Sequence, residues 1–214
     1  MINYDDTLFN IRISSGMPHP GALLVAEPFL KEEHFAHAVI CLVEYAPAST
    51  AMGIVLNHPT AYTLQGLVEG VSRKEKIRVW CGGPMSCDRL YYVHRLGELL
   101  PGSREIASGL YIGGDFEAML DYVNSGCDID GYIRFFIGYS GWSRDQLDQE
   151  IRDHVWAVTE IPDTAKALAG NEKGYWHRHV RAWPLLPRLA LPPPQPPAQL
   201  TAPRALAYYL SYHS

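Results

Sequence analysis

The sequence predicts an α+β fold. Strand-like apolar runs cluster within residues 22–112, and the clearest helical patterns come mostly after them. That order favours α+β over a regular alternation of strands and helices. With 214 residues, of which 47% are hydrophobic, the chain is long enough for one sizeable core and short for two full domains. We therefore expect one compact domain with appendages.

Three apolar runs near the N-terminus predict the first strands. They cover residues 21–28, 38–45 and 51–59, and Pro28 ends the first run because proline cannot donate a ladder hydrogen bond. The short connection between the second and third runs predicts an antiparallel hairpin. Gly53 inside the third run indicates a bulge or the close approach of another backbone.

Shorter segments continue this pattern. Residues 77–81, 90–94 and 109–113 are typical of strands, because they are rich in β-branched and aromatic side chains and bounded by loop residues. Residues 63–68 predict a short helix that precedes the first of these strands.

Two longer helices are indicated by their first residues. Asp115 is a suitable N-cap ahead of an amphipathic pattern. Ser143 followed three residues later by Gln146 is a capping-box pattern, so a second helix is expected to start directly after Ser143. Between these helices, residues 132–137 predict a buried strand that ends in a tight turn at residues 138–142.

The chain is expected to have three parts. Residues 1–20 form a surface lead-in with turn chemistry, and residues 21–183 form the single domain. Residues 184–214 form a proline-rich tail, in which the run at 191–197 can neither continue a helix nor enter a sheet. We expect this tail to be disordered or to adopt polyproline II structure.

The charge and hydropathy of the chain exclude several classes of function. The formal net charge of -5 and the pI of about 6.0 argue against a general electrostatic hold on nucleic acid. No apolar run approaches the roughly 20 residues that cross a bilayer, so no membrane partner is expected. The N-terminus lacks the basic start and apolar stretch of a secretory signal. We therefore expect a cytoplasmic protein.

The cysteines and histidines do not form a recognisable metal site. Cys41 and Cys81 lie in apolar runs, where a free thiol behaves as a small buried hydrophobe. No C-x-x-C pair is present. The close histidine pairs are His34 with His37 and His177 with His179. Because two ligands do not complete a zinc site, we expect no metal and no cofactor.

Two turn-like motifs suggest chemistry without completing it. A nucleophile elbow around Ser140 would need glycine two residues further on, where this chain has Trp142. The segment Gly82–Pro84 could present backbone N–H groups to an anion, but without a lysine and the full phosphate-loop spacing a tight turn is favoured. His58 and His94 each end a strand, and we expect them to be capping or surface groups.

Four collinear motifs carry a family resemblance. They are GALLVAEP at 21–28, AMGIVLNHP at 51–59, GGP at 82–84, and GYSGW at 138–142 with Gln146 and Leu147. In order and spacing they resemble the bacterial YqgE/AlgH family over roughly residues 20–160. One departure is that the family usually has histidine after the glutamate that ends its second strand, whereas Tyr45 follows Glu44 here.

The resemblance implies both a fold and a set of candidate site residues. The fold is α+β, with a bent, split, mostly antiparallel sheet that forms a pseudo-barrel flanked by helices. Most family members have no assigned function, some are labelled transcriptional regulators, and no catalytic residue can be carried over. The matching positions are candidates for a shared binding surface or pocket, or for turn and packing roles: Asn57, Gly82, Gly83, Pro84, Tyr139, Ser140, Gly141, Trp142 and Gln146.

Three functional hypotheses follow, in order of support. The first is a non-enzymatic binding domain, with a regulatory role, that holds a small ligand or a protein partner near Gly82–Pro84 and Gly138–Trp142. The second is a transcriptional regulator that binds DNA, which the acidic charge disfavours. The third is a hydrolase that uses Ser140.

Overall fold

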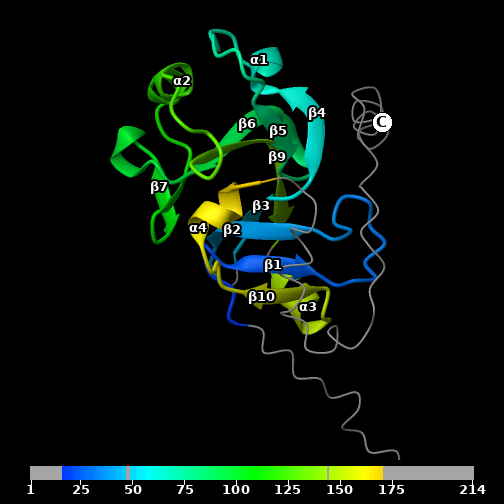
Figure 1. Ribbon diagram of the computed structural model, residues 1–214. Coiled ribbons are helices and arrows are strands. Elements are labelled where there is room, and N and C mark those ends of the chain that lie inside the picture. The colour runs from blue at the N-terminus through cyan, green and yellow to red at the C-terminus, as the bar shows by residue number, and fades with distance from the viewer. Residues whose placement is uncertain (1–15, 47–48, 144, 171–214) are drawn as a thin grey trace, which may run out of the picture.

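The described part of the chain forms a mostly antiparallel ten-stranded sheet with short helices at its margins (Figure 1). The computed structural model describes residues 16–46, 49–143 and 145–170. The strands are β1 (Leu23–Ala26), β2 (Val39–Tyr45), β3 (Ala51–Val55), β4 (Pro59–Thr63), β5 (Arg78–Cys81), β6 (Met85–His94), β7 (Arg104–Ala107), β8 (Leu110–Ile112), β9 (Ile133–Trp142) and β10 (Trp156–Thr159). The helices are α1 (Leu64–Leu67), the 3-10 helix η2 (Gly97–Leu99), α2 (Phe116–Asn124), α3 (Gln146–Arg152) and α4 (Thr164–Leu168). The predicted α+β class is confirmed.

The main path through the sheet runs in the order β10, β1, β2, β3, β9, β6, β8, β7. A branch leaves this path at β9, where β5 pairs with β9 and β4 pairs with β5. Because this path has two separate ends, β10 and β7, the sheet is not closed. The predicted hairpin of β2 and β3 is confirmed, with Ile40 opposite Val55 and Tyr45 opposite Ala51. The pairing of β1 with β10 was not expected, and it brings residues near 158 back to the first strand.

β9 is the strand on which the sheet splits. Its first half pairs in parallel with β5, with Trp80 opposite Phe136. Its last residues pair antiparallel with β3, with Ala51 opposite Trp142. β6 pairs with β9 from residue 133 to residue 139. Since a strand has two edges, β5 and β3 share the same edge of β9 in succession.

The predicted tight turn at residues 138–142 is wrong, because β9 continues through it as a strand. Gly138 has a φ of +72°, so it bends the strand without ending it. The bend is where the backbone of Gly82 and Gly83 crosses β9. A Cβ atom on Gly82 would lie 2.3 Å from the Gly138 carbonyl oxygen, and one on Gly138 would lie 2.4 Å from the Gly83 carbonyl oxygen. The absence of a Cβ atom at these glycines therefore lets the two backbones cross in close contact.

The helix predictions hold with small shifts of boundary. α2 begins after Asp115, whose side chain accepts a hydrogen bond of 2.8 Å from the backbone N–H of Ala118. α3 begins at Gln146, and the side-chain oxygen of that residue accepts a 3.1 Å hydrogen bond from the Ser143 N–H. This bond is half of the expected capping box.

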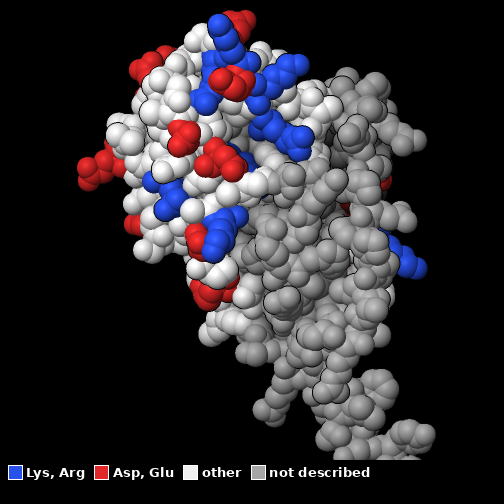
Figure 2. Space-filling view, in the orientation of Figure 1, with Lys and Arg blue, Asp and Glu red and all other residues white. Residues whose placement is uncertain are grey.

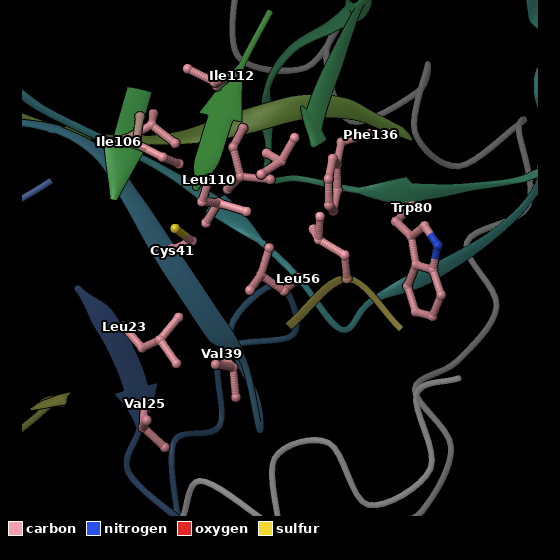
Figure 3. Close-up of a cluster of buried hydrophobic side chains, with 14 of the residues drawn as sticks. Leu23, Val25, Val39, Cys41, Leu56, Trp80, Ile106, Leu110, Ile112 and Phe136 are labelled. Carbon is pink, nitrogen blue, oxygen red and sulfur yellow. The ribbon is translucent and has the colours of Figure 1, made fainter. Parts of the chain in front are cut away.

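Three groups of buried side chains form the core. One lies where β1, β2, β8 and the β5–β9 pair meet, and Figure 3 shows it with Trp80 at one margin. A second surrounds Trp142 and Trp156 beneath α3, and a third lies between α2 and the opposite face of β5 and β9. The two faces of β5 thus contribute to different groups, as its alternation of side chains requires.

The remaining predictions about organisation are untested. The boundary at residue 183 and the proline-rich tail at 184–214 lie outside the described residues. Among the described residues, no helix is both long enough and apolar enough to span a bilayer.

Candidate functional site

The candidate residues that were predicted from the sequence occupy three places in the fold. Asn57 fastens the start of β2, because its Oδ1 accepts from the Val39 N–H and its Nδ2 donates to the His37 carbonyl, each at 2.8 Å. Both side-chain functions of Asn57 are therefore used within the protein.

A second group lies at the crossing of the glycines over β9. Ser140 is fully buried, and its hydroxyl donates to the Gly82 carbonyl at 3.3 Å. Tyr139 packs edge-on against Tyr91, with 5.8 Å between the ring centroids. A Cβ atom on Gly141 would lie 2.7 Å from the Met85 sulfur. The structure thus brings Gly82, Gly83, Tyr139, Ser140 and Gly141 together in tight packing, and Pro84 is exposed next to Gly83.

Trp142 and Gln146 lie apart from that crossing, around one carboxylate of α3. Oε2 of Glu150 accepts from the indole N–H of Trp142 at 2.8 Å and from that of Trp156 at 2.7 Å. Oε1 of Glu150 accepts from the Gln146 side chain at 2.9 Å. The arrangement fixes α3 to the sheet. The predicted binding role of all these residues stays a prediction, and none of them lines the groove described next.

A groove of about 330 Å³ lies beside β5 and the start of β9. We call it the Trp80 groove. Its volume is at the lower end of the range typical of small-molecule sites, roughly 300–1,000 Å³. It is lined by Arg73, Glu75, Lys76, Ile77, Arg78, Trp80, Ile129, Asp130, Ile133, Arg134, Leu168 and Gly170.

Strand alternation explains why an aromatic ring and two arginines meet in the groove. Val79 belongs to the group of side chains packed on α2, so its neighbours Arg78 and Trp80 point to the other face of β5. In the parallel pairing Trp80 lies opposite Phe136, and Arg134 is two residues before Phe136. Arg134 therefore projects on the same face as Trp80.

Arg134 is held against the indole ring. Its guanidinium carbon lies 4.3 Å from the centroid of the Trp80 ring, within the range of a cation–π interaction. Its Nη1 donates to the Leu56 carbonyl at 2.9 Å and its Nη2 donates to the Gly170 carbonyl at 2.8 Å. The residue is 4% exposed. Arg134 thus joins β9 to the end of α4 and forms the floor of the groove.

Trp80 brings a buried hydrogen-bond donor to the groove. The residue is only 5% exposed, and Figure 3 shows its nitrogen pointing away from the other labelled side chains. Among the residues that the structure describes, its indole N–H has no hydrogen-bond acceptor. A buried donor without an acceptor costs about 1–3 kcal/mol. An acceptor atom in the groove would remove that cost.

The rim of the groove is fixed by side chains of two helices. From α1, the Nε2 of Gln65 donates to the Glu75 carbonyl at 2.7 Å, and its Oε1 accepts from the Ile77 N–H at 3.2 Å. Asn124, at the end of α2, accepts from the Ser72 N–H at 2.9 Å. These bonds hold the loop that precedes β5 in one conformation.

Basic side chains outnumber acidic ones around the groove, although the whole chain has a formal net charge of -5. The bases are Arg73, Lys76, Arg78 and Arg134, and the acids are Glu75 and Asp130. Figure 2 shows Lys and Arg side chains gathered on the part of the surface where Figure 1 places α1, β4 and β5. Charges of one sign in a concave site raise the local concentration of ligands of the opposite sign.

The described residues that line the groove include no serine, cysteine or histidine. In the described ranges, no group of three or more His, Cys, Asp or Glu side chains could hold a metal ion. The alternation at residues 78–80 and a single arginine within an apolar strand are the sequence signals of this site. Neither signal is specific, so sequence reasoning missed the groove.

His94 caps its strand, as expected, but it is buried rather than at the surface. Its Nδ1 accepts from the Leu96 N–H at 3.2 Å, which leaves Nε2 to donate to the Gly113 carbonyl at 2.9 Å. Burial lowers the pKa of His94, consistent with this neutral tautomer.

Comparison with known proteins relates the chain to one family. A family model described as AlgH-like matches residues 23–186. A UPF0301 protein from Parabacteroides distasonis is 37% identical over 174 residues, which cover 81% of this chain and 87% of that protein. A UPF0301 protein from Bacteroides fragilis is also 37% identical, over 175 residues, which cover 82% of this chain and 88% of that protein.

Two solved structures share the fold. The solution structure of the AlgH protein from Pseudomonas aeruginosa superposes with a TM-score of 0.61 at 22% identity, covering 83% of this chain and 99% of that protein. A crystal structure of a protein from Corynebacterium diphtheriae gives a TM-score of 0.61 at 22% identity, covering 85% of this chain and 95% of the other. At this identity the likeness concerns the fold alone.

Proposed function

We propose that this chain, which belongs to the AlgH-like family, is a binding domain that holds a small molecule in the Trp80 groove. The observation that carries the proposal is that Trp80, which lines a space of about 330 Å³, is buried and has an indole N–H without an acceptor among the described residues. A ligand that offers an acceptor there gains a hydrogen bond and removes the cost of an unsatisfied donor.

Preorganisation supports this proposal. Gln65 and Asn124 hold the rim, and Arg134 holds the floor, through hydrogen bonds to backbone groups. A site whose lining is already ordered loses less conformational entropy when a ligand binds. The groove is therefore built as a preformed site, with the apolar side chain of Ile129 beside its polar groups.

A screen of small molecules tests the proposal on the full chain. Binding is detected by ¹H–¹⁵N NMR, and the site is located from the backbone signals of residues 73–80 and 129–134. We expect the hits to shift these signals. Trp80→Phe should lower the affinity for the hits about 2- to 10-fold, because one hydrogen bond of about 0.5–1.5 kcal/mol is lost. Tyr62→Phe, which removes one polar atom outside the groove lining, serves as the matched control.

Two results would count against this site. One is a set of hits whose shifts cluster at Gly82–Pro84 and Tyr139–Trp142, which would favour the site predicted from the sequence. The other is a Trp80→Phe protein that folds normally and binds every hit as tightly as the original chain.

A regulatory role is part of the proposal, because the groove joins separate elements. The Gly170 N–H donates to Asp130 at 2.8 Å, and Arg134 donates to the Gly170 carbonyl, so the end of α4 closes one side of the groove. A ligand that contacts both sides would hold α4 on the sheet more firmly. Such a difference between liganded and free states is what a sensor domain requires.

Binding to duplex DNA has less support. The longest helix among the described residues, α2, has nine residues. The cations of the groove surround a small hollow rather than forming an extended basic stripe, which phosphate contacts along a duplex would need. Binding to duplex DNA that weakens steeply with salt would favour this alternative. A hydrolase that uses Ser140 is disfavoured, since that hydroxyl is fully buried and donates to Gly82.

A further inference from the structure

The polar groups of the Trp80 groove differ in whether the protein already uses them. Both acidic side chains are engaged: Oε2 of Glu75 accepts from Arg73 Nε at 3.1 Å, and Oδ1 of Asp130 accepts from the Gly170 N–H at 2.8 Å. Arg73 also donates to the Cys127 carbonyl at 2.6 Å. Glu75, Asp130 and Arg73 therefore stabilise the walls of the Trp80 groove.

The groups without a partner are donors. Among the described residues, the Lys76 ammonium forms no ion pair and the Trp80 N–H has no acceptor. Lys76 is exposed at the rim, whereas Trp80 lies at depth. A ligand that satisfies both must present acceptor oxygens at its inner end and negative charge near the rim.

We propose that the ligand of the Trp80 groove is a small organic oxoanion, which carries a phosphate or carboxylate group. This inference rests on the proposed function, because it names the chemical class of ligand for the same site. An oxygen of the anion accepts from the Trp80 N–H, and its charge is balanced by the Lys76 ammonium at the rim. A neutral ligand would leave this ammonium without a counter-charge.

The size of the groove sets a second requirement. Its volume of about 330 Å³ lies within the range of roughly 300–1,000 Å³ that small organic ligands occupy. A free inorganic ion would fill only part of this space. The ligand therefore carries an organic portion, which packs on the partly exposed side chain of Ile129.

Isothermal titration calorimetry on the full chain, in buffer of low ionic strength, tests this inference. The probes are adenosine 5′-monophosphate, adenosine and citrate. We expect the monophosphate to bind at least about tenfold more tightly than adenosine. Citrate separates the two kinds of oxoanion: tighter binding of citrate assigns a carboxylate ligand, and tighter binding of the monophosphate assigns a phosphate ester.

Variants locate the charge contact. Lys76→Gln is expected to weaken oxoanion binding about threefold to tenfold and to reduce its dependence on salt, because one exposed charge is lost. Lys76→Arg should restore binding. Lys31→Gln removes one exposed charge outside the groove lining, and we expect it to leave the affinity unchanged.

The outcomes separate this inference from the proposed function. If adenosine binds as tightly as its monophosphate and shifts the NMR signals of the groove, the groove is a ligand site but the oxoanion class is wrong. If Lys76→Gln binds the oxoanions as well as the unmodified chain does, the charge assignment is wrong. If adenosine, its monophosphate and citrate all leave the signals of residues 73–80 unmoved, the oxoanion inference fails, while the wider screen decides the proposed function.

Discussion

At the residue scale, single polar atoms hold the large apolar side chains of this fold in place. Trp142 and Trp156 are both buried, and both indole N–H groups donate to the same oxygen of Glu150. Tryptophan N–H groups in a core usually find an acceptor, and here one short helix supplies it for two rings. The role of Trp142 is therefore explained by packing and by this shared bond.

Replacing Glu150 by alanine is expected to destabilise the protein by about 2–4 kcal/mol. Two buried N–H donors lose their acceptor, and each costs about 1–3 kcal/mol. Urea unfolding followed by circular dichroism measures the change. Glu69→Ala, at an exposed glutamate that follows α1, should change stability by less than about 0.5 kcal/mol. Equal stability of the two variants would show that the shared bond contributes little.

His58 makes the stability of the fold sensitive to acid. Burial is the main reason that the pKa of His58 falls from 6.5 to about 4, and His34 and His37 nearby lower it further, while a hydrogen bond to Ala36 opposes the shift. Above pH 6.5 the ring is neutral in both the folded and the unfolded chain. Between pH 6.5 and pH 4 only the unfolded chain takes up the proton, so folding stability is lost as the pH falls.

We expect His58 to account for a loss of about 1–3 kcal/mol between pH 6.5 and pH 4. The ring keeps some exposed surface, so the upper value is a bound. Chemical unfolding across this pH range, compared between the unmodified chain and His58→Asn, measures the contribution. His154→Asn, at an exposed histidine, is the control. A His58→Asn protein with an unchanged pH profile would refute this assignment.

At the scale of the element, β9 organises the molecule. Its edge passes from β5 to β3 within a few residues, and the change is possible because Gly82, Gly83 and Gly138 let the backbones approach. The same strand directs Arg134 toward the Trp80 groove on one face, while Ile133 and Phe135 pack in the group beneath α2 on the other. The split in the sheet and the groove are thus consequences of one strand.

The glycine crossing can be tested with a matched pair of substitutions. Gly138 and Gly102 have nearly the same φ, +72° and +74°, but a Cβ atom at Gly138 would lie 2.4 Å from a backbone oxygen, whereas at Gly102 nothing lies within 4 Å. Gly102→Ala should cost only the strain of the left-handed conformation, about 1–2 kcal/mol. Gly138→Ala adds a backbone clash, so we expect a further loss of more than about 2 kcal/mol or a failure to fold. Similar melting temperatures for the two variants would contradict the crossing.

At the scale of the whole molecule, local patterns predicted the elements better than their arrangement. The hairpin of β2 and β3, the cap at Asp115 and the α+β class follow from short-range signals, and the structure confirms them. Propensity could not show that residues 138–142 continue β9, because glycines that permit a crossing look like glycines that form a turn.

The groove was harder to predict for the same reason. Its lining comes from the loop before β5, the start of β9 and the end of α4, which are far apart in the sequence. The parallel pairing of β5 with β9 places Arg134 beside Trp80, and no local pattern specifies such a long-range pairing. The candidate residues drawn from family motifs instead fall mainly on buried packing and hydrogen-bonding positions.

The central claim is that the Trp80 groove is the ligand site. The most direct test follows the indole N–H signal of Trp80 in a ¹H–¹⁵N spectrum. The signal is assigned by its loss in Trp80→Phe and followed while an oxoanion hit is added to the full chain. We predict that it moves downfield and exchanges more slowly with solvent, because the ligand supplies the missing acceptor, while the signals of Trp142 and Trp156 stay in place. A ligand that saturates the protein and leaves the Trp80 signal unchanged would contradict the claim.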